Sequence, residues 1–323
     1  MSKDTKSHKI FVDLVGGIGN QLFGLVFGLA LSNKTKAELF LDTSFIRFGS
    51  NKSRKLEVEQ FIFSNNTIKY SSSKISNFPI LTNYNFSKKI IQKTMHATRR
   101  TIKESASNDH LKNYSRKHFS GYFQNWMYAD YLIQADPKFS IEIKKMEESL
   151  SVFEKQLVLK MPILVHVRLG DYLIHKDYFS ILPENYYIKA IEIMLNQNPN
   201  SPVWLIVESL EELKKTYPKL FNLPDKIIHQ RSHIKDHEIF YLMCKSKLLI
   251  ASNSTFSLWP SWFVLNSGGK VIVPSEFKVN GQNSDLIDGR WDSLNIEDFS
   301  FKNRIDLDQV RLDNYKNYIN LFD

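Results

Sequence analysis

The sequence predicts an α/β protein of two domains, and three observations support this prediction. The 323 residues are enough for two domains that each bury a core. Strand and helix patterns alternate along the chain, as they do in parallel sheets covered by helices. The apolar run PILVHVRLGD, which begins at Pro162, is typical of a parallel strand buried on both faces. A break at 155–162 predicts an N-terminal domain over 1–158 and a C-terminal domain over 159–323.

The first half of the chain is expected to begin with a strand, a glycine-rich loop and a helix. The apolar patterns place these and the following elements as a strand over 9–15, a helix over 22–32, a strand over 37–41, a short strand over 119–123, and helices over 125–135 and 146–159. The segment 60–118 is polar and basic and shows no clear periodicity. The sequence therefore predicts little about the middle of this domain.

The second half alternates more regularly. Its expected strands begin after Pro162 and cover 203–207, 227–228, 247–251 and 270–273. Its expected helices cover 184–196, 235–246 and 254–265, and a last helix covers 306–322 and packs back on the N-terminal domain.

Composition and cysteine content narrow the class of protein. An apolar fraction of 42% with 13% aromatic residues is typical of a globular protein. The single cysteine, Cys244, excludes a disulfide within the chain and fits a reducing compartment. The N-terminus is polar, and the longest apolar stretch, 22–31, is too short to cross a bilayer. We therefore expect a cytoplasmic protein.

The net charge of +9 is unevenly distributed. Segment 88–117 holds nine basic and two acidic residues, which could attract an anionic membrane surface, a phosphorylated ligand or nucleic acid. An ordinary solvated basic surface explains the same pattern. No motif with interleaved aromatic residues accompanies it, so we expect no nucleic-acid partner and consider a peripheral contact with an anionic membrane surface.

The loop VGGIGNQLFG carries three glycines, Gly16, Gly17 and Gly19, followed by Asn20 and Gln21. A dinucleotide-binding fingerprint would need a third glycine where Leu22 stands, and a phosphate-binding P-loop would need a lysine that is missing. What remains is a strand–glycine–helix turn whose backbone N–H groups can approach a ligand closely. A purely structural tight turn is the alternative.

The stretch VHVRLGDY places two polar residues on one face of a buried strand. His166 and Arg168 are two positions apart, near the carboxyl end where open α/β sheets bind ligands. Arg168 suits a phosphate or carboxylate, Gly170 allows a sharp turn, and Asp171 could accept a proton or orient Arg168. A structural ion pair between Arg168 and Asp171 is the alternative.

The stretch SNSTFSLWPSWF follows an apolar strand and opens with residues that favour helix N-caps, from Ser252 to Thr255. The start of this helix offers a second anion site, and an ordinary cap before a core helix is the alternative. His229, His233 and His237 have a helical metal-site spacing, but they span a strand end, a loop and a helix start. We therefore expect no metal there, and a buried core thiol at Cys244.

Four stretches together resemble the bacterial α-1,2-fucosyltransferases. These are GGIGNQLFG, the segment GYFQNWMY at 121–128, HVRLGDY with its H-x-R-x-G-D pattern, and SNSTFSLWPSW. Their order and spacing agree with the family from about residue 10 to 275. The resemblance implies a GT-B-type fold, in which two Rossmann-like domains face each other across a cleft and the second mainly holds a sugar-nucleotide donor. It also implies inverting transfer of L-fucose from GDP-β-L-fucose to the 2-hydroxyl of a galactoside, without metal or other cofactor.

The resemblance further implies a set of site residues and a cellular role. The expected donor-binding residues are Gly16, Gly17, Gly19, Asn20, Gln21, His166, Arg168, Glu208, Asn253, Ser254, Thr255 and Phe256. Tyr122 and Gln124 are expected at the acceptor or cleft, and Arg168, Asp171 and Asn20 are the expected catalytic residues, with Asp13 ranked behind Asp171 as the base. The expected role is O-antigen or other surface-polysaccharide synthesis on a galactoside or lipid-linked oligosaccharide.

Departures from the family pattern keep alternatives open. Where relatives carry F-S-D-D, this chain has Ile206, Val207, Glu208 and Ser209, so one acid persists and the second is absent. Leu258 and Pro260 also replace residues usual in the last motif. A transferase that uses another GDP-6-deoxyhexose, such as colitose, fits the same residues. An NAD(P)-dependent oxidoreductase and a non-enzymatic basic binding protein are the alternatives from other classes.

Overall fold

A computed structural model of the chain describes residues 8–48, 55–63, 68–71, 102–103, 118–135, 140–144, 148–174, 180–229, 234–277 and 286–321. The chain divides into two compact units. The first unit comprises 1–59, 63–139 and 311–323, and the second comprises 60–62 and 140–310. The main boundary thus falls near residue 140 and not at 158, because helix α5 (Glu148–Lys160) packs on helix α10 (Asp236–Lys245) of the second unit.

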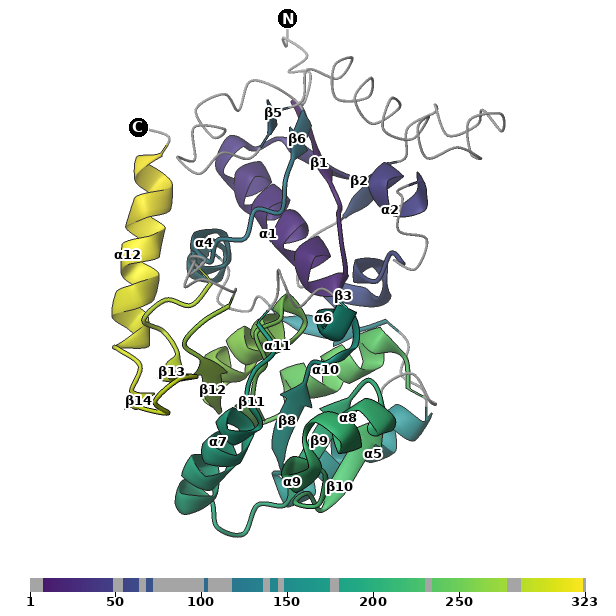
Figure 1. The fold of residues 1–323 in the computed structure, drawn as a ribbon. Helices are drawn as coiled ribbons and strands as arrows, with labels where there is room; N and C mark the ends of the chain where they lie inside the picture. Colours follow the sequence, from purple (N-terminus) through teal and green to yellow (C-terminus); the bar gives the residue numbers. More distant parts are fainter. Residues whose placement is uncertain are drawn as a thin grey trace, which may run out of the picture. The chain divides into compact units, whose positions relative to one another are not determined.

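The first unit is built on a parallel sheet. Its strands are β1 (Lys9–Asp13), β2 (Glu38–Asp42), β4 (Lys69–Ser71), β5 (Ile102–Lys103) and β6 (His118–Ser120). Their order is β4-β2-β1-β6-β5, and all neighbours are parallel. Strand β1 therefore lies between β2, the next strand in the chain, and β6, which follows about a hundred residues later (Figure 1).

Helix α1 (Ile18–Thr35) covers β1 and β2. It begins four residues earlier than the sequence predicts, because Gly17 is its N-cap and Gly19 lies inside its first turn. A Cβ atom at Gly28 would lie 2.7 Å from Leu39 of β2, so the glycine permits close packing of the helix on the sheet. Short helices α2 (Ser44–Phe48) and η1 (Val58–Gln60) and helix α4 (Met127–Ala135) complete the described part of this unit.

The last helix returns to the first unit. Helix α12 covers Leu307–Asn320, and from Arg311 onward it belongs to this unit. Tyr315 stacks on Tyr131 of α4 at 5.8 Å between ring centroids, and the Asn314 amide donates a 2.7 Å hydrogen bond to Asp130. Figure 1 shows the two helices side by side. Aromatic and polar contacts of α4 thus hold the C-terminal segment.

The second unit is built on a larger sheet. Its strands are β8 (Ile163–Val167), β9 (Val203–Val207), β10 (Lys226–His229), β11 (Leu248–Ile250), β12 (Lys270–Pro274), β13 (Asp292–Leu294) and β14 (Phe301–Lys302). Their order is β10-β9-β8-β11-β12-β13-β14, and only β13 and β14 pair antiparallel. Every residue of β8 and β9 is buried, as the continuous apolar runs predict.

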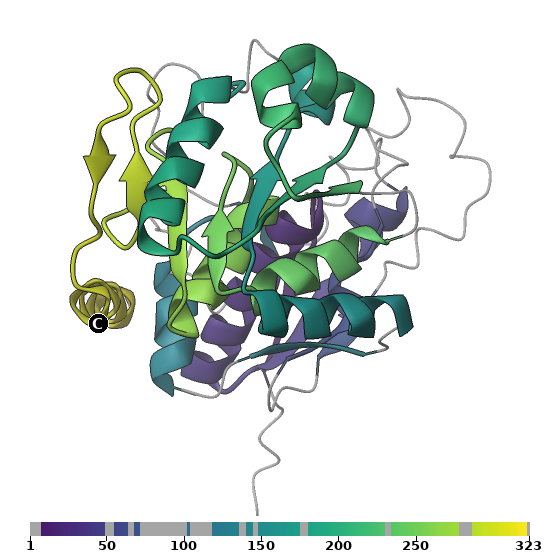
Figure 2. The ribbon, with the colours of Figure 1, turned by 90° about the horizontal axis from the view of Figure 1, so that it is seen from below.

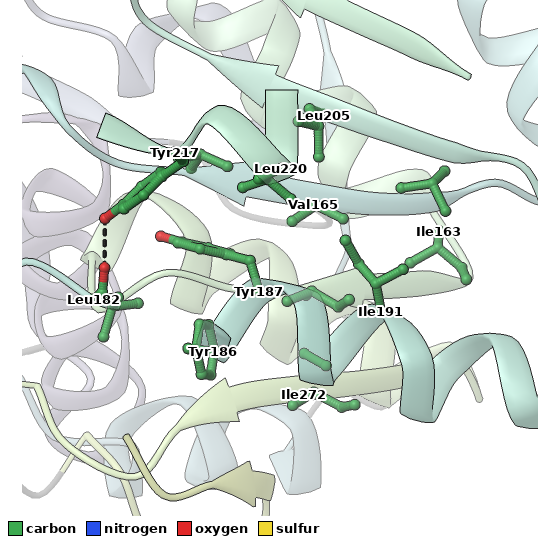
Figure 3. Close-up of a cluster of buried hydrophobic side chains, with 14 of the residues drawn as sticks. Ile163, Val165, Leu182, Tyr186, Tyr187, Ile191, Leu205, Tyr217, Leu220 and Ile272 are labelled. Carbon is green, nitrogen blue, oxygen red and sulfur yellow. Dashed lines mark hydrogen bonds between the residues drawn. The ribbon is translucent and has the colours of Figure 1, made fainter. Parts of the chain in front are cut away.

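Helices cover both faces of this sheet (Figure 2). Helices α7 (Glu184–Gln197), α8 (Leu210–Thr216) and α9 (Pro218–Phe221) lie on one face, and α5, α10 and α11 (Thr255–Asn266) lie on the other. The short helix α6 (Gly170–Ile174) follows β8, and strand β3 (Phe61–Phe63) pairs with β7 (Ile141–Ile143). Between α7 and the sheet, the side chains of Ile163 and Val165 from β8 and of Tyr187 and Ile191 from α7 form part of the core (Figure 3).

Each sheet reverses its strand order at a central strand. In the second unit, the chain runs outward from β8 to β10 and then returns to place β11 on the other side of β8. In the first unit, β2 and β6 flank β1 in the same way. Two units, each with a mainly parallel sheet and covering helices, confirm the predicted α/β fold class. Among the described residues, no helix is both long and apolar enough to span a bilayer.

Candidate functional site

Arg168 and Glu208 lie together at the carboxyl ends of two neighbouring strands. Val167 of β8 and Val207 of β9 are partners in register, so the residues that follow them emerge side by side. Arg168 Nη1 donates a hydrogen bond to Glu208 Oε1 at 2.5 Å, and the two side chains are only 10% and 6% exposed. The structure thus shows Glu208 as a partner of Arg168 that the sequence did not predict, while the alternative of an ion pair with Asp171 stays a prediction.

Gly170 makes room for the Glu208 carboxylate. A Cβ atom at Gly170 would lie 2.1 Å from Glu208 Oε2, so the carboxylate that pairs with Arg168 would have to move. Gly170 also begins α6, which contains Asp171. The side chain of Asp171 lies outside what the structure describes, so its role as base stays a prediction. The glycine of the H-x-R-x-G-D pattern therefore serves the Arg168–Glu208 pair through steric fit.

His166 is fully buried and serves the structure of the site. Its Nδ1 lies 2.9 Å from Ser252 Oγ, in the loop after β11, and its ring lies 5.3 Å from that of Phe256. Burial, with a smaller contribution from the Arg168 charge, lowers the pKa of His166 to about 3. The imidazole is neutral at physiological pH. A neutral imidazole adds no positive charge to the site, and the expected contact of His166 with the sugar-nucleotide donor stays a prediction.

The segment after β11 begins helix α11 and is held by its own side chains. Ser254 is the N-cap, and its Oγ accepts a 3.3 Å hydrogen bond from the Phe256 N–H. Asn253 donates both amide hydrogens, to Ser180 O at 2.8 Å and Phe277 O at 3.3 Å. Asn253 and Phe256 were both expected to contact the sugar-nucleotide donor. In the structure both are buried: Asn253 ties two backbone segments to the loop, and Phe256 packs against His166. Thr255, the first helical residue, is partly exposed.

Two tyrosines that the sequence analysis missed hold the same loop. Tyr172 of α6 donates its hydroxyl hydrogen to Asn253 O at 2.8 Å, and Tyr186 of α7 donates to Ala251 O at 2.7 Å. Burial raises the pKa of the Tyr186 hydroxyl well above its usual range. Nothing in the sequence marks these tyrosines, because their partners are backbone carbonyls about 65 to 80 residues away.

These residues gather at the switch point of the second sheet. Arg168 follows β8 and the start of α11 follows β11, and these two strands are neighbours at the point where the strand order reverses. Open α/β sheets bind ligands in this position. A guanidinium and the positive end of a twelve-residue helix, each after one of these two strands, are suited to an anion such as a diphosphate.

A second constellation lies at the switch point of the first sheet. Gly16 has φ +70°, and a Cβ atom there would lie 2.6 Å from Asn20 Nδ2, so the loop needs glycine at this position. Asn20 Oδ1 accepts a 2.8 Å hydrogen bond from Gln124 Nε2. The loop after β1 and the GYFQ segment after β6 therefore meet through two amides. Tyr122 of the same segment is 50% exposed.

Gln21 has a structural role that the sequence analysis did not predict. Its Nε2 donates to Gly16 O at 3.1 Å and to Lys55 O at 2.7 Å, and its Oε1 accepts from the N–H groups of Glu57 and Val58. The side chain is fully buried. Both amide hydrogens are used, which corrects the expectation that Gln21 donates to a ligand. Gly17 caps α1 and Gly19 is buried within it.

The remaining candidates are placed as follows. Asp13 is fully buried, with His118 Nε2 2.7 Å from its Oδ1, a pairing that sequence spacing could not reveal. Burial raises the pKa of the Cys244 thiol well above its usual range, as expected of a core thiol. His233 and the side chain of His229 lie outside the described residues, as does 88–117 apart from residues 102–103.

Comparisons with known proteins indicate the class of enzyme. No protein-family model matches the chain. It is 25% identical over 272 residues to an alpha-1,2-colitosyltransferase of Escherichia coli, covering 81% of this chain and 90% of the relative. It is 24% identical over 303 residues to the O-antigen biosynthesis glycosyltransferase WbnK of Escherichia coli, covering 87% of this chain and 99% of the relative. Similarity over most of the chain to two such enzymes supports glycosyltransferase activity.

Solved structures resemble the chain only distantly. A glycosyl transferase of family 9 from Veillonella parvula aligns over 99% of this chain and 94% of its own, with a TM-score of 0.47 and 12% identity. The fucosyltransferase NodZ from Bradyrhizobium aligns over 80% of this chain and 94% of its own, with a TM-score of 0.45 and 15% identity. At these values the likeness adds nothing to the functional argument.

Proposed function

We propose that this chain is an inverting, metal-independent glycosyltransferase that uses a GDP-6-deoxyhexose donor. The donor sugar in this proposal is L-fucose from GDP-β-L-fucose, transferred to the 2-hydroxyl of a galactoside in O-antigen or other surface-polysaccharide synthesis. The observation that carries the proposal is that Arg168 follows β8 and the start of α11 follows β11, the neighbouring strand at the switch point of the second sheet. The two Escherichia coli relatives support the same class.

Arg168 binds the diphosphate in this proposal. Its planar guanidinium suits phosphate oxygens, and the first N–H groups of α11 add hydrogen-bond donors. As the bond to the sugar breaks, negative charge develops on the departing GDP. Preorganised donors for such charge are worth about 2.7–4 kcal/mol each in other enzymes. Glu208 holds the guanidinium in place until the diphosphate arrives.

Asn20 supplies a neutral donor in the transfer step. The sugar carbon becomes cationic in an oxocarbenium-like transition state, so a lysine at this position would repel it, whereas an amide polarises without adding charge. Gln124 donates to Asn20 Oδ1 and so fixes which way the amide points. We assign the base to Asp171, because Asp13 is fully buried and engaged by His118.

Colitose is the alternative donor sugar, and one relative carries that activity in its name. Colitose differs from L-fucose by lacking the 3-hydroxyl. A site that hydrogen-bonds this hydroxyl rejects the deoxy analogue by about 10⁴-fold or more, whereas an apolar site discriminates weakly. Competition between GDP-L-fucose and GDP-colitose for one galactoside acceptor therefore decides the donor. Faster transfer of colitose would overturn the fucose assignment and leave the glycosyltransferase class intact.

The decisive binding test is calorimetric titration with GDP, GDP-L-fucose, UDP and NADH in the presence of EDTA. We expect GDP binding that persists in EDTA and weakens at least about tenfold in Arg168→Ala. Arg304→Ala is the matched control, because Arg304 is exposed and far along the chain from the switch point. GDP binding that requires a divalent ion would contradict the metal-free site, and binding of NADH without GDP would favour an oxidoreductase.

We also propose that the enzyme works at the inner membrane face, on lipid-linked acceptors. The basic segment 88–117 carries this proposal through its charge alone. Vesicles containing anionic lipid should bind the protein at low ionic strength and release it as salt is added. Absence of binding at low ionic strength would contradict the membrane contact. Salt-sensitive binding to nucleic acid in its place would support a basic binding protein.

A further inference from the structure

Three buried side chains of the first sheet converge near the carboxyl ends of β1 and β2. Asp13, Asp42 and His118 each offer one ligand atom, and these atoms all lie within 4.8 Å of one another. We call them the strand-end cluster. Asp13 and Asp42 are the last residues of β1 and β2 and are partners in register, while His118 begins β6 on the other side of β1. Three strands of the first sheet thus contribute to one point.

The cluster places negative charge in the interior. Asp13, Asp42 and His118 are 0%, 3% and 5% exposed. Asp13 Oδ1 faces His118 Nε2 at 2.7 Å, and Asp42 Oδ1 accepts a 2.9 Å hydrogen bond from the Ser44 N–H. Two carboxyl groups and one imidazole are thus buried within a few ångströms of one another, and bringing charged groups into the interior is costly unless they are paired or bind a metal.

One oxygen of the cluster has an unused lone pair. Among the described residues, Asp13 Oδ2 is buried and has no hydrogen-bond partner. A buried carboxylate oxygen ordinarily has a partner. This oxygen belongs to the residue that is central to the cluster, since Asp13 lies on the strand between β2 and β6. A cation held by the cluster would satisfy it and would offset the buried charge.

We propose that the strand-end cluster binds one divalent transition-metal cation, with Zn²⁺ and Mn²⁺ as the ions that its donors suit. Two carboxylate oxygens and one imidazole nitrogen match the ligand preferences of these ions, whereas Mg²⁺ and Ca²⁺ prefer oxygen ligands alone. His118 binds through Nε2, and the proton between Nε2 and Asp13 leaves when the ion enters. The ion ties β1, β2 and β6 together just before the glycine loop.

This site goes beyond the proposed function. The ion has no role at Arg168 in binding the donor, so EDTA removes the ion and leaves GDP binding in place. The cation site and the metal-independent binding of GDP can therefore be tested, and can fail, independently of each other. A metal-free protein that binds GDP but no Zn²⁺ or Mn²⁺ contradicts only the cation site.

The test is titration of chelator-treated full-length protein with ZnCl₂ and MnCl₂, each followed by calorimetry and by thermal unfolding. We expect one ion per chain and a higher midpoint of unfolding with the ion. Asp13→Asn keeps the size of the side chain and an acceptor for His118, and should weaken binding at least about tenfold. His237→Gln is the matched control, because His237 lies in α10, outside the strand-end cluster. The affinity of this variant for Zn²⁺ and Mn²⁺ should equal that of the wild type.

A measurement on the wild-type protein protects the test against variants that fail to fold. With Mn²⁺ bound, pulsed electron paramagnetic resonance detects coupling to an imidazole nitrogen, and this coupling should vanish in His118→Gln. Absence of stoichiometric binding, absence of nitrogen coupling in the wild type, or equal affinity in Asp13→Asn each overturns the proposal.

Discussion

The guanidinium of Arg168 and the carboxylate of Glu208 form a nearly buried ion pair, 2.5 Å apart, across the ends of β8 and β9. The pair has two opposing effects on an anionic ligand. Glu208 orients the N–H groups of the Arg168 guanidinium, and its negative charge opposes the approach of a phosphate. Removing the charge while keeping an oxygen acceptor separates these effects.

We predict that Glu208→Gln binds GDP about three- to tenfold more tightly than the wild type, because the competing carboxylate is gone and the amide oxygen still accepts from Arg168. Calorimetry at low ionic strength measures this. Glu211→Gln, an exposed change on α8, should leave affinity unchanged. Weaker GDP binding in Glu208→Gln would show that Glu208 itself contacts the donor.

The contact between Gly170 and Glu208 predicts a suppressor pair. Gly170→Ala places a methyl group 2.1 Å from Glu208 Oε2 and should destabilise the protein by about 1–3 kcal/mol, as overpacking does. Shortening the partner in Gly170→Ala/Glu208→Ala should remove most of this loss. Urea unfolding of the four proteins gives the coupling free energy. Additive losses would mean that the glycine is needed for its backbone alone.

The Asn20–Gln124 hydrogen bond predicts a non-additive effect on turnover. Asn20→Ala should lower kcat at least about tenfold without lowering the unfolding midpoint by more than a few degrees, since the side chain is only partly buried. Gln124→Ala should lower kcat by a smaller factor, and the double variant should be no worse than Asn20→Ala. An unchanged rate in Asn20→Ala would remove this residue from the mechanism.

Buried His166 predicts a pH dependence of stability with a defined sign. Its pKa is about 3 in the folded protein and near 6.5 when unfolded, so the unfolded chain binds the extra proton between these values. The free energy of unfolding should therefore fall as pH decreases from about 6.5, by up to about 1.4 kcal/mol per unit from this residue. His166→Gln should show a shallower slope. Equal slopes in both proteins would contradict a neutral buried imidazole.

Gln21 predicts a loss of stability without a direct loss of ligand contacts. Gln21→Ala leaves the N–H groups of Glu57 and Val58 and two carbonyls without their partner, and should cost about 2–4 kcal/mol. Gln134→Ala, at an exposed position of α4, is the control. Denaturant unfolding measures both. A loss no larger than that of the control would argue against the tether.

Local pattern determined much of the fold. Strand β9 lies at the predicted 203–207, and no end of helices α7, α10 and α11 differs from prediction by more than one residue. The apolar residues of these elements recur with a clear helix or strand period, a signal that can be read from short stretches of sequence. Helix α1 begins at Ile18, earlier than predicted, because Gly17 serves as its N-cap and the helix includes Gly19, which local propensity disfavours inside a helix.

The sequence by itself determined that this is an α/β chain with a glycine–amide loop, an H-x-R-x-G-D stretch and a capped helix start. Only the tertiary structure decided the partners: Glu208 for Arg168, Gln124 for Asn20, Ser252 for His166, and His118 for Asp13. The physical reason is strand order. Parallel strands pair across long connections, so the residues that meet at a switch point are set by which strands become neighbours, and no local pattern in the chain records that choice.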